Sequence, residues 1–439
     1  MGKLKFSRYA ILFEYNSLCL LFNSRNSSFL ELNKDLYYDL QDFKNGNSVA
    51  ILNDQEICQQ LHNMQVLVTE EEDNCFYEQM LLESYQSSFY TDTLTITFAP
   101  TIWCNLKCPY CFETNKFQGI VSQEVCDKVI DFISEHKSSK GINLTWYGGE
   151  PLLAIKRIDY FLNRLCEKGI NINSHSIVTN GTLLESSALK VFEKTHLDLI
   201  QITLDGNKEN HNRTRIYRDG SGTFDKIITN LDLFCERFPN TQVAVRVNTG
   251  NHNIKDYMEV YNFIHERYSE DVHVYPGILV GDNDCGFTSQ FFTKEGISTF
   301  YTKLIRNHLF KEFPHRMSST CTATSLYGYV IGPKGEIYKC WEDVGIKEKE
   351  IGSVLDGKIS NRSLFQQYML HGTFRDSNSC KICSLLPICD GGCPRHRIEN
   401  RMNGGKYNLC SHFNLNNQAS LKELLYLYYC EKKKSFIKV

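Results

Sequence analysis

The chain has 439 residues, of which 42% are hydrophobic and 23% are charged, as in a globular protein of two or three domains. Lys and Arg (48) nearly balance Asp and Glu (51), so the charge gives no reason to expect nucleic acid or an anionic membrane as a partner. No apolar run approaches the roughly 20 residues that span a bilayer, and the first residues lack the cleavage site of a signal peptide. We therefore expect a cytoplasmic protein.

Residues 1–90 are expected to fold as a small unit. The predicted strands are the apolar runs 9–13, 18–22 and 28–32, and the predicted helices are 33–43, 54–62 and 72–86. Strands followed by helices are typical of a winged-helix-like α+β module. Acidic residues outnumber Lys and Arg in this segment, which disfavours DNA binding because a surface that contacts phosphates should be basic.

From residue 93 to about 280, strand and helix patterns alternate. The predicted strands are 94–100, 142–147, 174–179, 199–204, 242–248 and 272–279. The predicted helices are 122–136, 155–168, 183–194, 224–236 and 254–267. This alternation predicts a parallel α/β domain, either an open doubly wound sheet or a partial (β/α)6 barrel. Regular periodicity fades after about 315, and a last helix is predicted over 416–432.

Polar and glycine-rich segments follow these strands where each strand ends. The cysteines of "CNLKCPYC" (104–111) follow the first strand, and "GGEP" (148–151) follows the second. "TNGT" (179–182) and Asp205 follow the next two, and Arg246 lies in the fifth. Each segment alone is typical of a turn. Because active sites of barrels are built at the carboxyl ends of the strands, their common location predicts a site there.

Ten of the eighteen cysteines fall into two spaced groups, which in a reducing compartment indicates metal binding rather than disulfides. Cys104, Cys108 and Cys111 can hold three corners of a cubane iron–sulfur cluster, because thiolates suit iron. The fourth iron then has no protein ligand, whereas a structural zinc site is closed by four ligands. An open coordination position indicates catalysis.

This CxxxCxxC spacing resembles the motif of the radical S-adenosylmethionine (SAM) superfamily. The resemblance implies a 4Fe–4S cluster whose open iron binds SAM, with reductive cleavage to a 5′-deoxyadenosyl radical that abstracts a hydrogen atom from the substrate. It also implies an electron donor such as flavodoxin or ferredoxin. The SAM contacts that follow from the resemblance are Tyr110, Gly148, Gly149, Glu150, Asn180, Asp205 and Arg246. For Arg246, a structural role in the core is the alternative.

The second cysteine group resembles the SPASM extension, CX9–15GX4C–gap–CX2CX5CX3C–gap–C, at every position. The matching residues are Cys321, Gly335, Cys340, Cys380, Cys383, Cys389, Cys393 and Cys410. The resemblance implies two auxiliary 4Fe–4S clusters, for three clusters in all. Cys380, Cys383, Cys389 and Cys410 would hold the distal one.

Cys321, Cys340 and Cys393 would hold the auxiliary cluster nearer the barrel, with a fourth position taken by Cys285, His315, a substrate atom or nothing. A zinc ribbon is disfavoured because it does not account for Cys321 and Cys340. The expected divisions of the chain are 1–90, a barrel at 91–285, a bridging region at 286–320, the SPASM domain at 321–413 and a C-terminal helix at 414–439.

The sequence also gives expectations for several residues outside the two cysteine groups. Asn212 stands in "LDGNKENHNRTR" where the family pattern has Asp, which argues against an acid–base role. Glu342 and Asp343, after Cys340, stand where relatives that oxidise a substrate carbon can keep a carboxylate, but we expect both to be surface charges. The eight cysteines outside the two groups are expected to be small buried hydrophobic residues for the most part.

Superfamily membership does not determine the substrate. SPASM enzymes that modify ribosomally made peptides often carry a winged-helix-like module that captures a leader peptide at a sheet edge. We therefore expect a maturase that installs a thioether C–S or a C–C crosslink in a precursor peptide. The alternative is an anaerobic sulfatase-maturing enzyme that forms formylglycine, although such relatives generally begin close to the cluster loop. A non-catalytic iron–sulfur carrier is disfavoured because it needs no SAM pocket.

Overall fold

The computed structural model describes residues 3–90, 92–111, 119–136, 141–251, 253–279, 291–310, 314–317, 321–411 and 418–436. The chain forms two compact units. The first, here called the terminal unit, combines Met1–Tyr90, Lys294–Cys321 and Leu370–Val439. The second, here called the barrel unit, combines Thr91–Thr293 and Thr322–Met369. The predicted SPASM segment is thus divided between the units, and its assignment as one domain stays a prediction.

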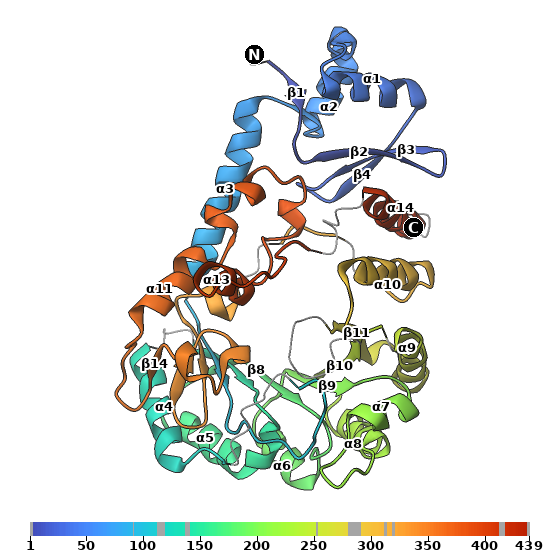
Figure 1. The fold of residues 1–439 in the computed structure, drawn as a ribbon. Coiled ribbons are helices and arrows are strands. Elements are labelled where there is room, and N and C mark those ends of the chain that lie inside the picture. Colours follow the sequence, from blue (N-terminus) through green and yellow to red (C-terminus); the bar gives the residue numbers. More distant parts are fainter. Residues whose placement is uncertain are drawn as a thin grey trace. The chain divides into compact units, whose positions relative to one another are not determined.

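The barrel unit contains all six predicted parallel strands. They are β6 (Leu94–Phe98), β7 (Ile142–Trp146), β8 (Ile172–Thr179), β9 (Leu199–Leu204), β10 (Gln242–Thr249) and β11 (Val272–Ile278). Each strand pairs in parallel with the next strand in the chain (Figure 1). A doubly wound sheet reverses its strand order, and this sheet does not, so the partial barrel is confirmed over the doubly wound alternative.

Helices connect these strands as predicted. They are α4 (Gln123–His136), α5 (Ile155–Glu167), α6 (Ser186–Lys194), α8 (Phe224–Arg237) and α9 (Ile254–Tyr268). The sequence did not predict α7 (Lys208–Thr214), a polar helix of two turns that begins at the N-cap Asn207, whose side chain accepts a hydrogen bond from the Asn210 N–H group at 3.1 Å.

Three further strands extend the sheet beyond β6. They are β12 (Gly328–Ile331), parallel to β6, and then β13 (Glu336–Tyr338) and β14 (Gly352–Ser353), each antiparallel to its neighbour. The sequence did not predict them because they have two to four residues, too few for a periodic pattern. The helix α11 (Arg362–His371) follows them.

The terminal unit begins with a three-stranded antiparallel sheet in chain order. Its elements in the first 90 residues are β1 (Lys5–Phe6), β2 (Ala10–Tyr15), β3 (Leu18–Asn23), β4 (Ser28–Leu32), α1 (Lys34–Asn45), α2 (Gln55–Asn63), β5 (Leu67–Val68) and α3 (Glu70–Phe89). All three predicted strands and all three predicted helices are confirmed. Later elements are α10 (Lys294–Arg306), α12 (Asn378–Lys381), α13 (Pro394–Met402) and the predicted last helix α14 (Gln418–Phe436).

The β2–β4 sheet is covered on both faces, because side chains of β3 alternate between two cores. Leu20 and Phe22 pack with Ile388 and with Leu424 of α14. Leu21 packs with residues of α1, α2 and β5. The first 90 residues therefore share a hydrophobic core with the last part of the chain.

Among the described residues, the structure contains no helix that is both long and apolar enough to cross a membrane. The expectation that most scattered cysteines are buried is wrong: Cys19 and Cys126 are buried, whereas Cys75 and Cys166 are exposed. Both exposed cysteines lie on helices that face solvent on one side, where no packing partner requires an apolar residue.

Candidate functional site

The cysteine loop begins where β6 ends, at the carboxyl edge of the parallel sheet. Cys104 is buried, and Cys108 and Cys111 are partly exposed. The loop is anchored to the segment after α7, because the Lys107 N–H group donates to the Ile216 carbonyl at 3.0 Å. The structure thus places the three thiols at the predicted edge of the barrel unit.

Polar groups surround the first cysteine of the loop. The Cys104 Sγ atom accepts a hydrogen bond from the Leu106 N–H group at 3.4 Å, and Asn180 Nδ2 lies 3.7 Å from the same sulfur. Asn180 Nδ2 also donates to Asn105 Oδ1 at 2.9 Å. Donors to sulfur favour the thiolate and influence the reduction potential of a bound cluster. This environment fits a cluster ligand.

Asn180 is buried, and its side-chain amide forms hydrogen bonds with other residues of the protein. Its Oδ1 atom accepts from the backbone N–H and the hydroxyl of Thr182, at 2.9 and 2.7 Å. The residue therefore connects the end of β8 to the cysteine loop. Its predicted contact with SAM stays a prediction.

Gly148 and Gly149 allow the turn after β7 to approach the backbone that precedes Cys104. A Cβ atom on Gly148 would lie 2.2 Å from the Thr101 carbonyl oxygen, and one on Gly149 would lie 2.3 Å from the Trp103 carbonyl oxygen. The Gly149 N–H group donates to the Thr101 carbonyl at 3.1 Å. Any side chain here would displace the cysteine loop. The predicted approach of both glycines to SAM stays a prediction.

Glu150 is fully buried. Its carboxylate accepts hydrogen bonds from the Leu152 N–H group at 3.0 Å, the Thr179 hydroxyl at 2.7 Å and the Asn180 N–H group at 2.7 Å. Burial raises the pKa of Glu150, and these donors oppose that rise. A buried carboxylate has about four acceptor positions, so one is available for the predicted bond to the SAM ammonium group, which stays a prediction.

Tyr110 connects the cysteine loop to the ends of β9 and β10. Its hydroxyl donates to Asp205 Oδ2 and accepts from Arg215 at 3.1 Å and from Asn248 Nδ2 at 3.3 Å. Burial and the neighbouring Asp205 raise the pKa of Tyr110 far above its usual value. The hydroxyl therefore anchors the loop, and the predicted position of the ring near adenine stays a prediction.

Asp205 and Arg215 each present a buried atom that lacks a hydrogen-bond partner among the described residues. These atoms are Asp205 Oδ1 and Arg215 Nε, and the carboxylate lies 3.9 Å from the guanidinium. Because buried polar atoms are rarely left unsatisfied, this pair fits a polar ligand or an ordered water. The predicted contact of Asp205 with SAM is compatible with this arrangement.

Two arginines of this site were not predicted from the sequence. Arg215 lies beside Tyr110, and Arg218 stacks its guanidinium 3.7 Å from the centre of the Trp103 ring and donates to the Cys104 carbonyl at 3.1 Å. The cluster of arginines in "NRTRIYR" is a visible signal, but nothing local indicates that this segment folds onto the cysteine loop. Arg246, which was predicted, donates to Asn248 Oδ1 at 3.1 Å.

The segment after β9 has structural roles. His211 is buried: its Nδ1 atom accepts from the Asp205 N–H group at 3.4 Å, which assigns the proton to Nε2 and a donated bond to the Thr223 hydroxyl at 2.9 Å. Burial lowers the pKa of His211 well below its usual value. Asn212 Oδ1 accepts from the N–H groups of Thr223 and Phe224 and so fixes the start of α8. These contacts give Asn212 a structural role.

The expectation for Asp343 is wrong. Asp343 is fully buried, and its Oδ2 atom accepts a hydrogen bond from the Tyr368 hydroxyl at 2.7 Å. A charged residue tolerates burial when it is paired or hydrogen-bonded, and the sequence does not indicate that α11 supplies this partner. Glu342 is partly exposed.

The structure brings together the four cysteines predicted to hold the distal cluster. Burial raises the pKa of the Cys383 thiol, and the neighbouring thiols of Cys389, Cys380 and Cys410 raise it further. The guanidinium of Arg397 donates to Cys380 Sγ at 3.6 Å and to the Gly391 carbonyl at 2.6 Å. A cation beside a thiol favours the thiolate form.

The set predicted for the other auxiliary cluster is divided between the two units. Cys321 and Cys393 belong to the terminal unit, and Cys340 belongs to the barrel unit. The assignment of this set therefore stays a prediction. Of its possible fourth ligands, Cys285 lies outside the described residues, and His315 lies in the terminal unit.

Among the described residues, no three side chains of His, Cys, Asp or Glu are arranged to hold a single metal ion. In a cubane each thiolate binds a different iron, so the sulfur atoms stand farther apart than the ligands of one ion. The distal set, with four thiols and an adjacent cation, fits an iron–sulfur cluster by the chemistry of its donors.

Residues 98–283 match the model of the Radical SAM superfamily. This match, together with the parallel barrel and the cysteines at its carboxyl edge, identifies this part of the chain as an enzyme domain of the radical SAM type. A radical SAM domain implies a 4Fe–4S cluster and SAM as cofactors.

A curated relative and two solved structures are similar to this chain. The cysteine-type anaerobic sulfatase-maturating enzyme of Clostridium novyi is 25% identical over 364 aligned residues, which cover 74% of this chain and 94% of the relative. The structure of anSMEcpe with bound AdoMet and the Kp18Cys peptide aligns with a TM-score of 0.62 and 19% identity, over 79% of this chain and all of that one. Streptococcus suis SuiB bound to its precursor peptide SuiA aligns with a TM-score of 0.50 and 16% identity, over 94% of this chain and all of that one.

Proposed function

We propose that the protein is a radical SAM maturase that oxidises a Cys or Ser side chain of a peptide or protein substrate to formylglycine. The observation that carries this proposal is the alignment over 94% of the length of a sulfatase-maturating relative. It supports the alternative expected from the sequence better than it supports peptide crosslinking. The higher TM-score of anSMEcpe, 0.62 against 0.50 for SuiB, agrees in fold.

Different residues at the carboxyl edge of the barrel are the proposed contacts of the cluster and of SAM. When bound, the cluster and SAM supply a 5′-deoxyadenosyl radical that abstracts a hydrogen atom. Cys104, Cys108 and Cys111 are the proposed cluster ligands, and the Leu106 N–H group and the Asn180 side-chain amide stabilise the Cys104 thiolate.

The adjoining turns supply the proposed SAM contacts. Gly148 and Gly149 place the turn after β7 against the cysteine loop, which brings the Glu150 carboxylate to the same edge. Tyr110 and Asp205 hold the opposite side of the loop. Arg246 is held by Asn248, next to the Tyr110 hydroxyl.

The proposed oxidation removes two hydrogen atoms from the side chain. One leaves as a hydrogen atom that completes 5′-deoxyadenosine, and the other leaves as a proton and an electron. A substrate Ser becomes the aldehyde directly, whereas a substrate Cys becomes a thioaldehyde in which water then replaces the sulfur, released as hydrogen sulfide. The departing electron requires an acceptor, and an auxiliary 4Fe–4S cluster, if held by the chain, would supply that electron-accepting capacity. The ligand set Cys380, Cys383, Cys389 and Cys410 is the proposed site of that cluster.

A second candidate function is crosslinking of a ribosomally made precursor peptide, and the sheet of the first 90 residues favours it. Among the described strands, β2 and β4 each pair on one side only, so each has an edge to which a peptide strand can add. The solved structure of SuiB with precursor peptide SuiA aligns over 94% of this chain, which includes part of this segment. Against this candidate, the sheet shares its core with α14 and is not a separate module.

The cofactor assignments are tested on anaerobically reconstituted protein. Three clusters predict roughly 12 iron atoms per chain. With reductant and SAM, the protein should release 5′-deoxyadenosine, and Cys104→Ala, Cys108→Ala or Cys111→Ala should abolish that release. Cys166→Ala, an exposed cysteine outside both groups, is the matched control and should leave it unchanged. Release that survives the loss of a loop cysteine contradicts the assignment.

The two candidate functions are distinguished by their products. Sulfatase-derived peptides that carry Cys or Ser at the modified position should yield an aldehyde that reacts with a hydrazide, and a Cys peptide should also release sulfide. A crosslinked product has lost two hydrogens, contains no aldehyde and gives fused fragments in tandem mass spectrometry. Crosslinks without aldehyde would establish the second candidate in place of the first.

A further inference from the structure

Two of the proposed distal cluster ligands pack against a hydrophobic core to which the first 90 residues contribute. The buried members of this core are Tyr9, Tyr77, Met80, Phe374 and Leu386, and Cys380 and Cys383 pack against them. Tyr9 lies just before β2, and Tyr77 and Met80 lie on α3. Residues that are about three hundred positions away in the sequence therefore cover the CxxC segment.

Cys383 also contacts the second core of the terminal unit. It packs against the cluster of Phe13, Leu20 and Phe22, which are side chains of the β2–β3 hairpin. Cys383 is partly buried and thus packs against side chains of both the sheet and α3. Apolar contacts of this kind limit the access of water to a thiol and to any metal that it binds.

Polar contacts fix the backbone of the CxxC segment on both sides. Arg8 donates to the Lys381 carbonyl at 3.3 Å, and the Ser24 hydroxyl donates to the Ser384 carbonyl at 2.5 Å. The Lys381 ammonium group lies 5.8 Å from the centre of the Tyr77 ring. The loop that carries two ligands is therefore held by residues before β2, after β3 and on α3.

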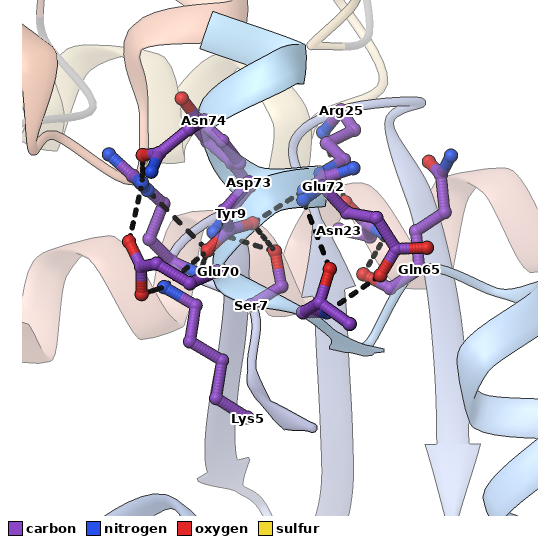
Figure 2. A network of polar contacts seen from close by, with 12 residues as sticks. Lys5, Ser7, Tyr9, Asn23, Arg25, Gln65, Glu70, Glu72, Asp73 and Asn74 are labelled. Carbon is purple, nitrogen blue, oxygen red and sulfur yellow. Dashed lines mark hydrogen bonds and ion pairs between the residues drawn. The ribbon is translucent and has the colours of Figure 1, made fainter. Parts of the chain in front are cut away.

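A buried network around Asp73 positions these contacts (Figure 2). Asp73 is fully buried and accepts from the Arg8 N–H group at 3.0 Å, from the Ser7 hydroxyl at 2.8 Å and from Arg25. The Arg25 guanidinium lies 4.6 Å from the centre of the Phe76 ring. Because Asp73 fixes the backbone of Arg8, it orients the guanidinium that reaches the CxxC segment.

We propose that the first 90 residues and the distal cluster form one cooperative structural unit, in which the loaded cluster holds the β2–β4 sheet and α3 in place. This inference rests on the proposed ligand set Cys380, Cys383, Cys389 and Cys410. The cluster thereby controls the order of a segment that is about three hundred positions away from its ligands in sequence, and loss of the cluster releases that segment.

The local structure around the ligands explains why binding of the cluster should stabilise the first 90 residues. Cys380 lies in α12, a helix of four residues, and Cys389 and Cys410 lie outside α-helices and strands. Short irregular segments contribute little folding free energy of their own. Metal binding to such segments is coupled to folding, so the binding free energy stabilises whatever packs on the ligands.

The experiment compares amide hydrogen exchange in full-length, anaerobically reconstituted protein and in Cys410→Ala. Cys410 is exposed and is not part of the core around Tyr77, so its loss removes a ligand without removing a packing contact of the sheet. The expected result is a loss of about 4 iron atoms per chain. Amides of α3 and β3 should then exchange at least about 10-fold faster, because the segment opens more often.

Cys111→Ala is the matched control. It should also lose about 4 iron atoms, from the barrel unit, while the exchange of α3 and β3 stays within about twofold of the wild type. Equal acceleration in both variants would show a general response to iron loss and would overturn the proposal.

A second experiment tests whether the first 90 residues in turn stabilise the distal cluster. It uses Arg8→Gln, with Lys5→Gln as its control. Both side chains contact Asp73, but only Arg8 reaches the CxxC segment. Under a fixed concentration of an iron chelator, Arg8→Gln should lose its distal iron several-fold faster than the wild type, and Lys5→Gln should not. Equal rates in the two variants would contradict the proposal.

The outcomes separate this inference from the assignment on which it rests. If Cys410→Ala retains all its iron, the ligand set is wrong, and the inference falls with it. If iron is lost but α3 and β3 keep their protection, the ligand set stands and the coupling is refuted.

Discussion

Cys104 in the barrel unit and Cys383 in the terminal unit are both proposed cluster ligands, but their surroundings differ. Around Cys104 the contacts are polar, from Asn180, the Leu106 N–H group and the backbone held by Arg218. Around Cys383 they are the aromatic and aliphatic side chains of two hydrophobic cores.

Because their surroundings differ, ligands of the same kind can serve two purposes. A polar surrounding fixes a loop in position and still accommodates a charged ligand such as SAM at an open iron. An apolar surrounding excludes water and couples the ligands to the folding of their neighbours. The barrel segment is therefore suited to a cluster that binds SAM, and the CxxC segment to a cluster that is coupled to the fold.

The largest expected loss of stability comes from Asp73→Asn, which tests the buried ion pair of the terminal unit. The amide leaves the nearly buried Arg25 guanidinium without a counter-charge, and breaking such a pair costs about 3–5 kcal/mol. The free energy of opening of α3, from amide hydrogen exchange, should fall by this amount. Glu70→Gln is the control, because Glu70 pairs with Lys5 and Arg8 at the surface, where a pair contributes about 0–1 kcal/mol. Similar losses in both variants would contradict the role of burial.

Gly149→Ala tests the polar loop of the barrel unit. The added Cβ atom would lie 2.3 Å from the Trp103 carbonyl oxygen, and relief of this clash should cost about 3 kcal/mol and displace the cysteine loop. The three tryptophans all belong to the barrel unit, so their fluorescence during urea unfolding measures the change. Gly357→Ala, where no atom lies within 4 Å, should cost only about 1–2 kcal/mol for its positive φ and should retain the iron. Retained iron in Gly149→Ala would show that the loop tolerates the shift.

Asn180→Ala tests the same loop without a clash. It removes the bond to Asn105 and leaves the Thr182 groups without their acceptor, which should cost about 2 kcal/mol. The reduction potential of the barrel cluster should also change, because a donor near the Cys104 sulfur is lost. Asn143→Ala, whose amide makes one long bond of 3.5 Å to Thr95, should cost about 0.5 kcal/mol or less. An unchanged potential in Asn180→Ala would exclude its contact with the sulfur.

The smallest effect is a difference in pH dependence between the units. Burial lowers the pKa of His175 below its usual value of 6.5, so the unfolded chain takes up a proton that the folded barrel unit does not. The stabilisation from His175 is therefore complete above pH 6.5. Below pH 6.5 the free energy of unfolding falls by about 1.4 kcal/mol per pH unit for each such histidine.

In the terminal unit, burial tends to raise the pKa of Asp73, but the hydrogen bonds that it accepts outweigh this and lower it below the usual 3.8. Stability from Asp73 is thus retained above pH 3.8 and lost only as the pH falls further. Between pH 7 and 5, tryptophan fluorescence should report weakening of the barrel unit while the exchange protection of α3 persists. His175→Gln should reduce the slope, and an unchanged slope would assign the effect to other groups.

The sequence alone predicted the elements that depend on local pattern. The six strands of the barrel and the strands and helices of residues 1–90 follow from hydrophobic periodicity. The cysteine spacing predicted the loop at the end of β6 and the set that includes Cys380 and Cys383, because ligands on one short segment are close in any fold.

Which distant residues meet became visible from the folded structure and not from the sequence. Tyr110 and Asp205 are 95 positions apart, and Ser24 and Ser384 are 360 apart, yet each pair is hydrogen-bonded. No local pattern encodes such pairs, because they arise when strands and helices pack and bring their ends together. The same reason explains why the burial of Asp73, the role of Gly149 and the shared core of the first and last segments became visible only in the fold.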